Sequence, residues 1–292
     1  MNETAATLGF IGLGVMGGPM CRNVVKKHGG PVHAFDMNPA ALEELREAGA
    51  VTTQSITELA RAAKVIFLSL PGGKQVQAVC AEIADVAAPG TIIVDLSTTS
   101  VAEARAVAAT LAESDILFAD APVARTRQAA QEGTLSIMVG ASEELFARIQ
   151  PLLSYMGSDV TRCGEVGCGQ VVKLINNCLL FEHVAALAEM MVVAERAGVG
   201  REKLIEAVSL GSGDSFALRN HGLKAMAPGV FPEKAFPSTY ALKDLGYAIE
   251  LADQMGVEPR LPRLASQYYE AAVEKGIGSK YFPAIIELIG KE

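Results

Sequence analysis

The first 164 residues alternate short apolar runs with stretches of helical pattern, and this alternation most constrains what the chain can fold into. Residues 7–11 form an apolar run that ends at Gly12. Similar runs follow along the chain, at residues 32–35, 65–70, 91–94, 116–119, 135–139 and 160–163. Helical patterns separate them, at residues 15–28, 56–62, 74–84, 101–113 and 143–155. Strands joined by crossover helices predict a parallel sheet covered by helices on both faces.

After residue 164 the strand pattern ends and the chain becomes helical in character. Residues 169–196 carry apolar side chains at helical spacing, which predicts a helix about 40 Å long. Shorter helices are predicted at residues 201–210, 240–256 and 261–275. Three glycines cluster between residues 164 and 169 and mark the boundary. We therefore predict an α/β domain over residues 1–164 and an all-helical domain over residues 165–292, built on the long helix that leaves the first domain.

Length and charge limit the classes of partner. A chain of 292 residues exceeds what one hydrophobic core usually organises, which agrees with two domains. The formal net charge of −8 argues against nucleic acid or an anionic membrane surface as the main ligand. An anionic small substrate would need a local cationic site. The longest apolar stretch is interrupted by polar residues, so no membrane span is expected.

Cysteine content and the first residues indicate the compartment. Five cysteines, an odd number, fit no disulfide framework in a chain of this length. Cys163 and Cys168 lack the partners and spacing of a zinc site, so no metal is expected. Residues 1–4 show no basic segment before an apolar one, and no signal peptide is expected. A reducing, cytoplasmic setting is the simplest interpretation.

The glycine pattern after the first strand predicts a dinucleotide site. Residues 12–17 read Gly-Leu-Gly-Val-Met-Gly, which matches G-x-G-x-x-G between a strand and a helix. Gly12 allows a tight turn, Gly14 lets the backbone approach a pyrophosphate, and Gly17 permits close packing of helix on strand. The helix N-terminus supplies N–H donors for the anion. A plain strand–helix turn is the alternative for this motif.

Asp36, at the end of the next strand, bears on the choice of cofactor. A carboxylate there accepts hydrogen bonds from the adenosine ribose hydroxyls and repels a 2′-phosphate. No Arg or Lys follows in Met37-Asn38-Pro39 to hold such a phosphate. The sequence therefore favours NAD over NADP. A solvated acidic strand end is the alternative for Asp36.

Four segments resemble the β-hydroxyacid dehydrogenase family, which includes 3-hydroxyisobutyrate dehydrogenases and contains a domain like that of 6-phosphogluconate dehydrogenase. They lie, in the family's order and spacing, at residues 9–17, 120–123 with 133–135, 169–177 and 243–245. The resemblance covers nearly the whole chain. It implies an α/β fold with a Rossmann-type, doubly wound parallel sheet followed by an all-helical domain, and a homodimer or homotetramer formed through the helical halves.

Lys173 and Asn177 are the predicted chemical centre. Their i, i+4 spacing places both on one face of a helix. Hydride transfer at an alcohol carbon needs a group that exchanges the hydroxyl proton, and a buried lysine can do this. The resemblance implies that Lys173 is the catalytic residue and that Asn177 helps to hold the substrate. A solvated helix lysine is the alternative.

The resemblance adds Lys243, which matches a second active-site lysine of the family and could attract a carboxylate. Strand ends line the ligand crevice of an open sheet, which indicates Leu70, Pro71 and Thr98 as cofactor neighbours. The predicted cofactor-binding set is Gly12, Leu13, Gly14, Val15, Met16, Gly17, Asp36, Leu70, Pro71, Thr98 and Lys243. The predicted substrate-binding set is Val123, Arg125, Thr126, Asn177 and Lys243.

The segment after Val123 departs from the family pattern. The family commonly reads Ser-Gly-Gly there, whereas this chain has Ala124, Arg125 and Thr126. The serine hydroxyl is absent, and a guanidinium suited to carboxylate, sulfonate or phosphate oxygens stands at a glycine position. Sulfolactaldehyde reductases of the same family carry a similar Arg-Thr pair. Whether Arg127 also faces the site is left open.

The sequence, with this resemblance, thus predicts an NAD-dependent dehydrogenase of a small anionic β-hydroxy acid or its semialdehyde, of the 3-hydroxyisobutyrate or tartronate-semialdehyde type. Three alternatives stay open. The first is a sulfolactaldehyde reductase acting on a three-carbon sulfonate. The second is a non-catalytic dinucleotide-binding protein, and the third an imine reductase, although Lys173 counts against both.

Overall fold

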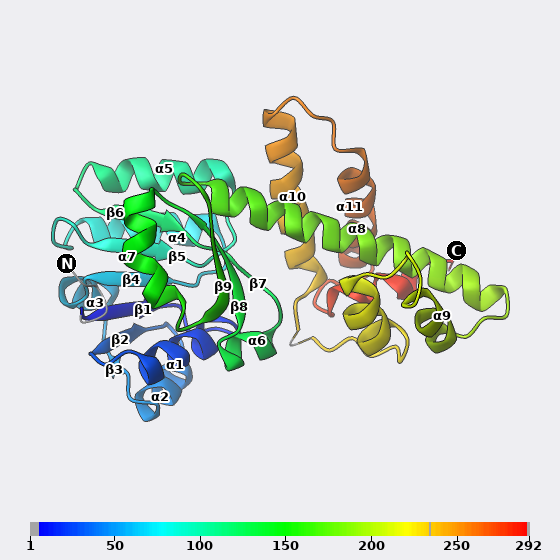
Figure 1. Cartoon of the computed structure of the whole chain (residues 1–292), viewed down its shortest axis with the longest axis horizontal. Helices are drawn as coiled ribbons and strands as arrows, with labels where there is room; N and C mark the ends of the chain where they lie inside the picture. The colour runs from blue at the N-terminus through cyan, green and yellow to red at the C-terminus, as the bar shows by residue number, and fades with distance from the viewer. Residues whose placement is uncertain (1–5, 234, 291–292) are drawn as a thin grey trace. The chain divides into compact units, whose positions relative to one another are not determined.

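The structure is a computed structural model that describes residues 6–233 and 235–290 (Figure 1). The expectation of no signal peptide concerns residues 1–4, which lie outside the described residues. The chain divides into two compact units, Met1–Lys173 and Leu174–Glu292. The division falls inside a single helix, α8 (Cys168–Arg196), rather than in a loop.

The first unit is built on one sheet with the strand order β3-β2-β1-β4-β5-β6-β8-β7, in which β9 pairs with β8. The strands are β1 (Leu8–Ile11), β2 (Val32–Phe35), β3 (Val51–Thr52), β4 (Val65–Leu68), β5 (Ile92–Asp95), β6 (Leu117–Asp120), β7 (Val123–Ala124), β8 (Leu135–Gly140) and β9 (Gly157–Gly164). Neighbouring strands in the run β3-β2-β1-β4-β5-β6 are all parallel, as predicted for those that the sequence pattern identified, while β8 runs antiparallel to β6 and β7. The chain reverses its direction of winding between β1 and β4, where an open sheet binds ligands.

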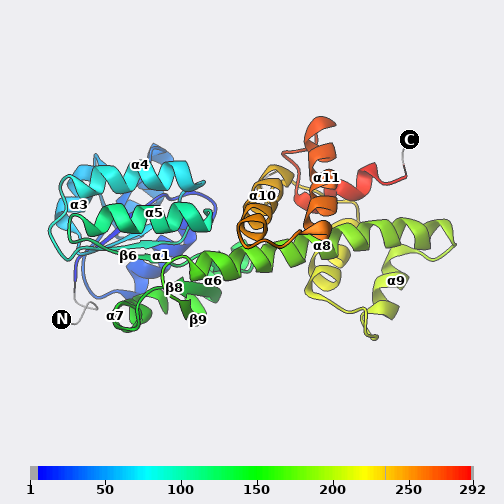
Figure 2. The same ribbon diagram turned by 90° about the horizontal axis from the view of Figure 1, so that it is seen from above.

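Both faces of this sheet are buried, because strand residues alternate between two apolar layers. On β1 and β4, Phe10 and Phe67 pack in one layer, whereas Ile11 and Ile66 pack in the other. Figure 2 shows α4 (Gly73–Ala84) and α5 (Val101–Ala112) over one face and α7 (Glu143–Leu153) over the other. The first unit also contains α1 (Gly17–Lys27), α2 (Pro39–Glu47), α3 (Ile56–Ala62) and the short α6 (Arg127–Glu132).

The second unit is helical around a separate core. Its elements after α8 are α9 (Arg201–Val208), the π-helix η2 (Ala217–Met226), α10 (Ser238–Gln254), α11 (Arg260–Glu274) and the 3-10 helix η3 (Phe282–Leu288). Phe181 of α8 lies at the centre of the core, with ring centroids 5.7 Å from Tyr269 and 5.2 Å from Phe282. Such aromatic contacts hold helices from distant parts of the chain together.

Helix α8 corrects one expectation from the sequence. Within the described part of the chain it is long and apolar enough, by length and composition, to cross a membrane, despite its polar residues. Its buried face carries Phe181, Val184, Ala188 and Met191, which form the core of the second unit. We therefore assign this face of α8 to the core of the second unit, and its burial accounts for part of the apolar character of the helix.

The structure also contains short elements that the sequence pattern did not predict: α2, β3, β7, α6 (Arg127–Glu132), η2 and η3. Each is short or irregular, so apolar periodicity is weak over its length. Helix α2 nevertheless carries clear start signals. Asn38 accepts a hydrogen bond from the Ala40 N–H, and Pro39 is the first helical residue.

Candidate active site

The glycine turn after β1 has the geometry of a dinucleotide cradle. Gly12 has φ of 93°, and a Cβ there would lie 2.2 Å from the Ser69 carbonyl oxygen. A Cβ on Gly17 would lie 2.0 Å from the Gly12 carbonyl oxygen. Both positions therefore require glycine. At Gly14 a Cβ would meet nothing within 4 Å, which leaves open space beside the backbone for a phosphate group.

Helix α1 begins directly after this turn and is suited to an anion. Its first turn contains no acidic residue, and no side chain of the described residues caps it. The N–H groups of an uncapped helix start, together with the helix dipole, attract phosphate. The residues present therefore fit the pyrophosphate of a dinucleotide.

Asp36 holds the glycine turn in place. Its Oδ2 accepts the Leu13 N–H at 2.5 Å, and its Oδ1 accepts the Asn38 N–H at 2.7 Å. The carboxylate lies at the end of β2, which pairs with β1 from Leu8↔Val32 to Ile11↔Phe35. Asp36 is thus beside the turn, where the adenosine ribose of a dinucleotide binds in this fold.

The ends of β4 and β5 are joined by a network that the sequence did not predict. The Leu70 N–H donates to Ser97 Oγ at 2.9 Å. The buried Gln170 side chain brackets Thr98, since its Nε2 donates to the Ser97 carbonyl at 2.8 Å and its Oε1 accepts the Thr99 N–H at 3.2 Å. Gln170 lies one turn before Lys173 on α8. The Thr98 loop and the start of α8 are therefore held together.

Asp120, the last residue of β6 and the first of the predicted motif at residues 120–123, holds the start of α8. Its Oδ1 accepts the Gly167 N–H at 2.6 Å and its Oδ2 accepts the Gln170 N–H at 2.8 Å. These bonds satisfy donors that a helix start leaves unpaired. Burial raises the pKa of Asp120 to about 6, against the lowering effect of the backbone hydrogen bonds from Gly167 and Gln170.

The raised pKa of Asp120 predicts a specific dependence of stability on pH. Between about pH 4 and pH 6 the folded state binds more protons at this group than the unfolded state does. Its contribution to the free energy of unfolding should therefore fall as pH rises through that range, by on the order of 3 kcal/mol. Urea unfolding of the wild type and Asp120→Asn at a series of pH values isolates the effect. A difference between the two proteins that stays constant from pH 4 to 6 would contradict it.

Lys173 and Asn177 lie on one face of α8, as their spacing predicts, and both are buried, with 8% and 5% of their surface exposed. Asn177 Nδ2 donates to Asp244 Oδ2 at 2.7 Å. Asp244, on α10, is 2% exposed. Asp244 lies in the 243–245 segment that resembles the family, but no sequence pattern indicated a role for its carboxylate.

Lys243 shares the same carboxylate. Its Nζ lies 3.2 Å from Asp244 Oδ1. The same Nζ lies 5.2 Å from the ring centroid of Tyr247 and 5.8 Å from the ring centroid of Tyr240. A cation between aromatic faces and a carboxylate is restricted in orientation. Asp244 thus connects Asn177 and Lys243, two residues that the sequence assigned to the substrate.

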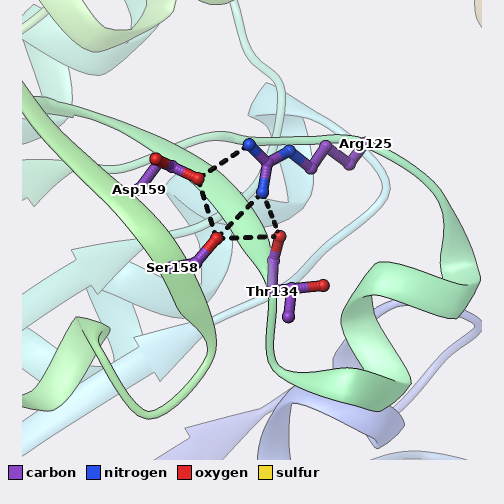
Figure 3. Close-up of polar contacts among 4 residues, drawn as sticks. All are labelled: Arg125, Thr134, Ser158 and Asp159. Carbon is purple, nitrogen blue, oxygen red and sulfur yellow. Dashed lines mark hydrogen bonds and ion pairs between the residues drawn. The ribbon is translucent and has the colours of Figure 1, made fainter.

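Arg125 adopts a backbone conformation that L-residues rarely occupy, with φ of 88°. This agrees with glycine at the position in the family pattern. Its guanidinium contacts Thr134, Ser158 and Asp159 (Figure 3), and the ion pair from Nη2 to Asp159 Oδ2 is 2.7 Å.

The residues on either side of Arg125 belong to regular elements. Val123 and Ala124 form β7, which pairs with Ile137 and Ser136 of β8. Thr126 caps α6, since its Oγ1 accepts the Ala129 N–H at 3.3 Å. Its own hydroxyl hydrogen can still be donated to a ligand. No cluster of His, Cys, Asp or Glu side chains that could hold a metal ion occurs among residues 6–233 and 235–290.

Comparisons with known proteins agree with this geometry. Residues 7–164 match the family described as the NAD binding domain of 6-phosphogluconate dehydrogenase, and residues 167–289 match the NAD-binding region of NADP-dependent 3-hydroxyisobutyrate dehydrogenase. The chain is 36% identical to 2-(hydroxymethyl)glutarate dehydrogenase of Eubacterium barkeri, over 98% of this chain and 95% of that protein. It is 33% identical to human mitochondrial 3-hydroxyisobutyrate dehydrogenase, over 98% of this chain and 87% of that protein.

A solved structure shares the architecture of the whole chain. Mycobacterium tuberculosis 3-hydroxyisobutyrate dehydrogenase, in a structure with L-serine, superposes with a TM-score of 0.90 at 31% identity, covering 98% of this chain and 100% of that one. The chain belongs to the β-hydroxyacid dehydrogenase family. It is accordingly a hydroxyacid dehydrogenase with a dinucleotide-binding domain, which sets aside a non-catalytic binding protein.

Proposed function

We propose that the protein transfers a hydride between NAD and a small anionic β-hydroxy acid of the 3-hydroxyisobutyrate or hydroxymethylglutarate type, or the corresponding semialdehyde. The observation that carries this proposal is that Lys173, which the resemblance implies is the catalytic residue, is a buried lysine on α8. Bound NAD supplies the hydride acceptor or donor. The names of the similar proteins support a small hydroxy acid as the substrate class.

In this proposal each site residue has one task. Lys173 Nζ takes the hydroxyl proton during oxidation and returns it during reduction. Asn177, oriented by Asp244, holds the substrate oxygen beside Lys173. Burial of Lys173 and Asn177 keeps water away and strengthens their polar contacts. The anionic group of the substrate is bound by Arg125 and Thr126, with the Val123 backbone beside them.

Asp36 supports NAD rather than NADP as the cofactor. We expect Asp36→Ala to lower kcat/KM for NAD by about 10- to 150-fold, because charge-assisted hydrogen bonds to the ribose are lost. Activity with NADP should not fall in parallel, since repulsion of the 2′-phosphate is also removed. Initial rates with both cofactors give the ratio of kcat/KM for NAD to kcat/KM for NADP. Asp36→Asn serves as the matched variant that removes only the charge. A wild-type enzyme that prefers NADP would refute the assignment.

A three-carbon sulfonate is the second candidate substrate, and Arg125 with Thr126 is the observation that favours it. A guanidinium pairs with sulfonate oxygens as well as with carboxylate oxygens. The test compares a sulfonate with the carboxylate of the same carbon skeleton in the wild-type enzyme. If the carboxylate has the higher kcat/KM, the sulfonate candidate is wrong.

We also propose a cytoplasmic homo-oligomer formed through the helical unit. Exposed apolar residues on α8 support this association: Ile175, Leu179, Met190 and Val193 are 50–56% exposed. Covering such residues with a second copy removes apolar surface from water. The molecular mass in solution, measured by sedimentation equilibrium, distinguishes a monomer, a dimer and a tetramer.

The five cysteines, all free in the structure, are consistent with a reducing compartment.

A further inference from the structure

The guanidinium of Arg125 is held at three points by the protein itself. Nη1 donates to the Thr134 carbonyl at 2.5 Å and to Ser158 Oγ at 2.9 Å, and Nη2 donates to Asp159 Oδ2 at 2.7 Å. Ser158 Oγ also donates to Asp159 Oδ2 at 2.7 Å, so the two residues of β9 act as one unit (Figure 3). A long side chain that would otherwise sample many rotamers is thereby restricted to one orientation.

These contacts occupy one edge of the guanidinium and leave a second edge available to a ligand. Arginine has five N–H donors and can bind an anion through two parallel bonds. Ser158 and Asp159 take the edge formed by Nη1 and Nη2. Nε–H and the second Nη2 hydrogen have no hydrogen-bond partner within the part of the chain that the structure describes. These two donors form the remaining bidentate edge.

The backbone around Arg125 is fixed as well. Ala124 pairs with Ser136 in the sheet, and Thr126 is the N-cap of α6, so residue 125 is held between two regular elements at φ of 88°. A strained backbone persists where its surroundings determine it, and such positions concentrate at functional sites. Both ends of the Arg125 side chain are therefore constrained.

Stability alone does not account for this arrangement. The side chains of Arg125 and Asp159 are 43% and 56% exposed, and exposed ion pairs contribute little to folding. The Ser158 hydroxyl, followed by the hydrogen bond and charge of Arg125, lowers the pKa of Asp159. The carboxylate is thus charged at neutral pH, as its ion pair with Arg125 requires.

We propose that Ser158 and Asp159 are positioning residues for substrate recognition, which orient Arg125 so that its Nε–Nη2 edge binds the carboxylate or sulfonate of the substrate. This inference rests on the proposed function, in which Arg125 binds the anionic group. The gain is preorganisation, since an arginine already held in its binding orientation loses less freedom when substrate binds.

The test is a double-mutant cycle on KM. Asp159→Ala should raise KM for the best anionic substrate by about 2- to 12-fold, the cost of immobilising one free side chain, with a smaller change in kcat. In an Arg125→Ala background, Asp159→Ala should add nothing, because the side chain that it orients is gone. Asp159→Asn keeps an oxygen acceptor for Arg125 and Ser158 and should restore KM to within about twofold of wild type.

Asp253→Ala is the matched control, since Asp253 is also exposed and paired with an arginine, Arg263, at 2.5 Å. It should leave KM unchanged. The inference is overturned if Asp159→Ala leaves KM unchanged in the wild-type background, or if it raises KM equally in both backgrounds. If Arg125→Ala itself leaves KM unchanged, the proposed anion site is wrong and the inference falls with it. If Arg125→Ala raises KM while Asp159→Ala does not, only the inference fails.

Discussion

Replacing Lys173 with alanine should lower kcat by about 10²- to 10⁴-fold, the contribution of a positioned general acid–base group. NAD affinity should stay close to that of the wild type, because we propose that the dinucleotide is bound mainly by the glycine turn after β1, which Asp36 holds through the Leu13 N–H. Stopped-flow measurement of NADH formation gives the rate, and fluorescence titration gives the affinity for NADH.

Two further variants separate proton transfer from charge and packing. Lys173→Arg retains the positive charge, but a guanidinium does not give up its proton near neutral pH, so this variant should be as slow as Lys173→Ala. Lys203→Ala removes an exposed lysine paired with Glu206 and should have wild-type kcat. A Lys173→Ala enzyme that retains most of its turnover would remove this residue from the mechanism.

Arg125→Ala should raise KM for the anionic substrate by about 10- to 150-fold. A charge-assisted hydrogen bond contributes about 1.5–3 kcal/mol, and each 1.4 kcal/mol is a factor of ten. Because the anionic group fixes the position of the reacting carbon, kcat can also fall. Steady-state kinetics with the anionic substrate and with a neutral alcohol of similar size measure the effect. A KM for the anionic substrate that does not change would show that Arg125 does not bind it.

Arg125→Gly distinguishes the lost contact from the strain of the backbone. Its KM should match that of Arg125→Ala, since both variants lack the guanidinium. Its free energy of unfolding should exceed that of Arg125→Ala by about 1 kcal/mol, because glycine adopts the observed φ of 88° without a Cβ penalty. Equal stability of the two variants would argue against strain at this position.

The sequence predicted the parallel part of the sheet and the long helix, because both give strong periodic signals. Buried strands such as Val65–Leu68 are continuous apolar runs, and α8 keeps helical spacing over many turns. It could not predict β7 or the π-helix Ala217–Met226, because two paired residues or an irregular turn leave no periodic pattern. The boundary near residue 164 stays a prediction, and the compact units divide at Lys173 because α8 is continuous across the junction.

For the candidate site, the motif positions could be predicted from the sequence, but the residues that hold them in place by hydrogen bonds could not. Gly12 and Gly17 were identified from spacing alone, and close backbone approach explains both. Gln170, Asp244 and Asp159 act through hydrogen bonds to residues far away in the sequence, and no local pattern indicates such partners. Arg125 was predicted to face an anion. The structure adds that three protein groups already hold it.

The most direct test of the central claim is kcat/KM of the wild-type enzyme across a panel of substrates with NAD and with NADP. The panel comprises 3-hydroxyisobutyrate, 3-hydroxypropionate, 2-(hydroxymethyl)glutarate, serine, glycerate, 4-hydroxybutyrate, 2,3-dihydroxypropanesulfonate and neutral alcohols of matching size. We expect the highest value for a small anionic β-hydroxy acid with NAD, and at least about tenfold lower values for the neutral alcohols, as the loss of one charge-assisted hydrogen bond implies. Equal activity on a neutral alcohol, or no NADH formation with any anionic member of the panel, would contradict the account.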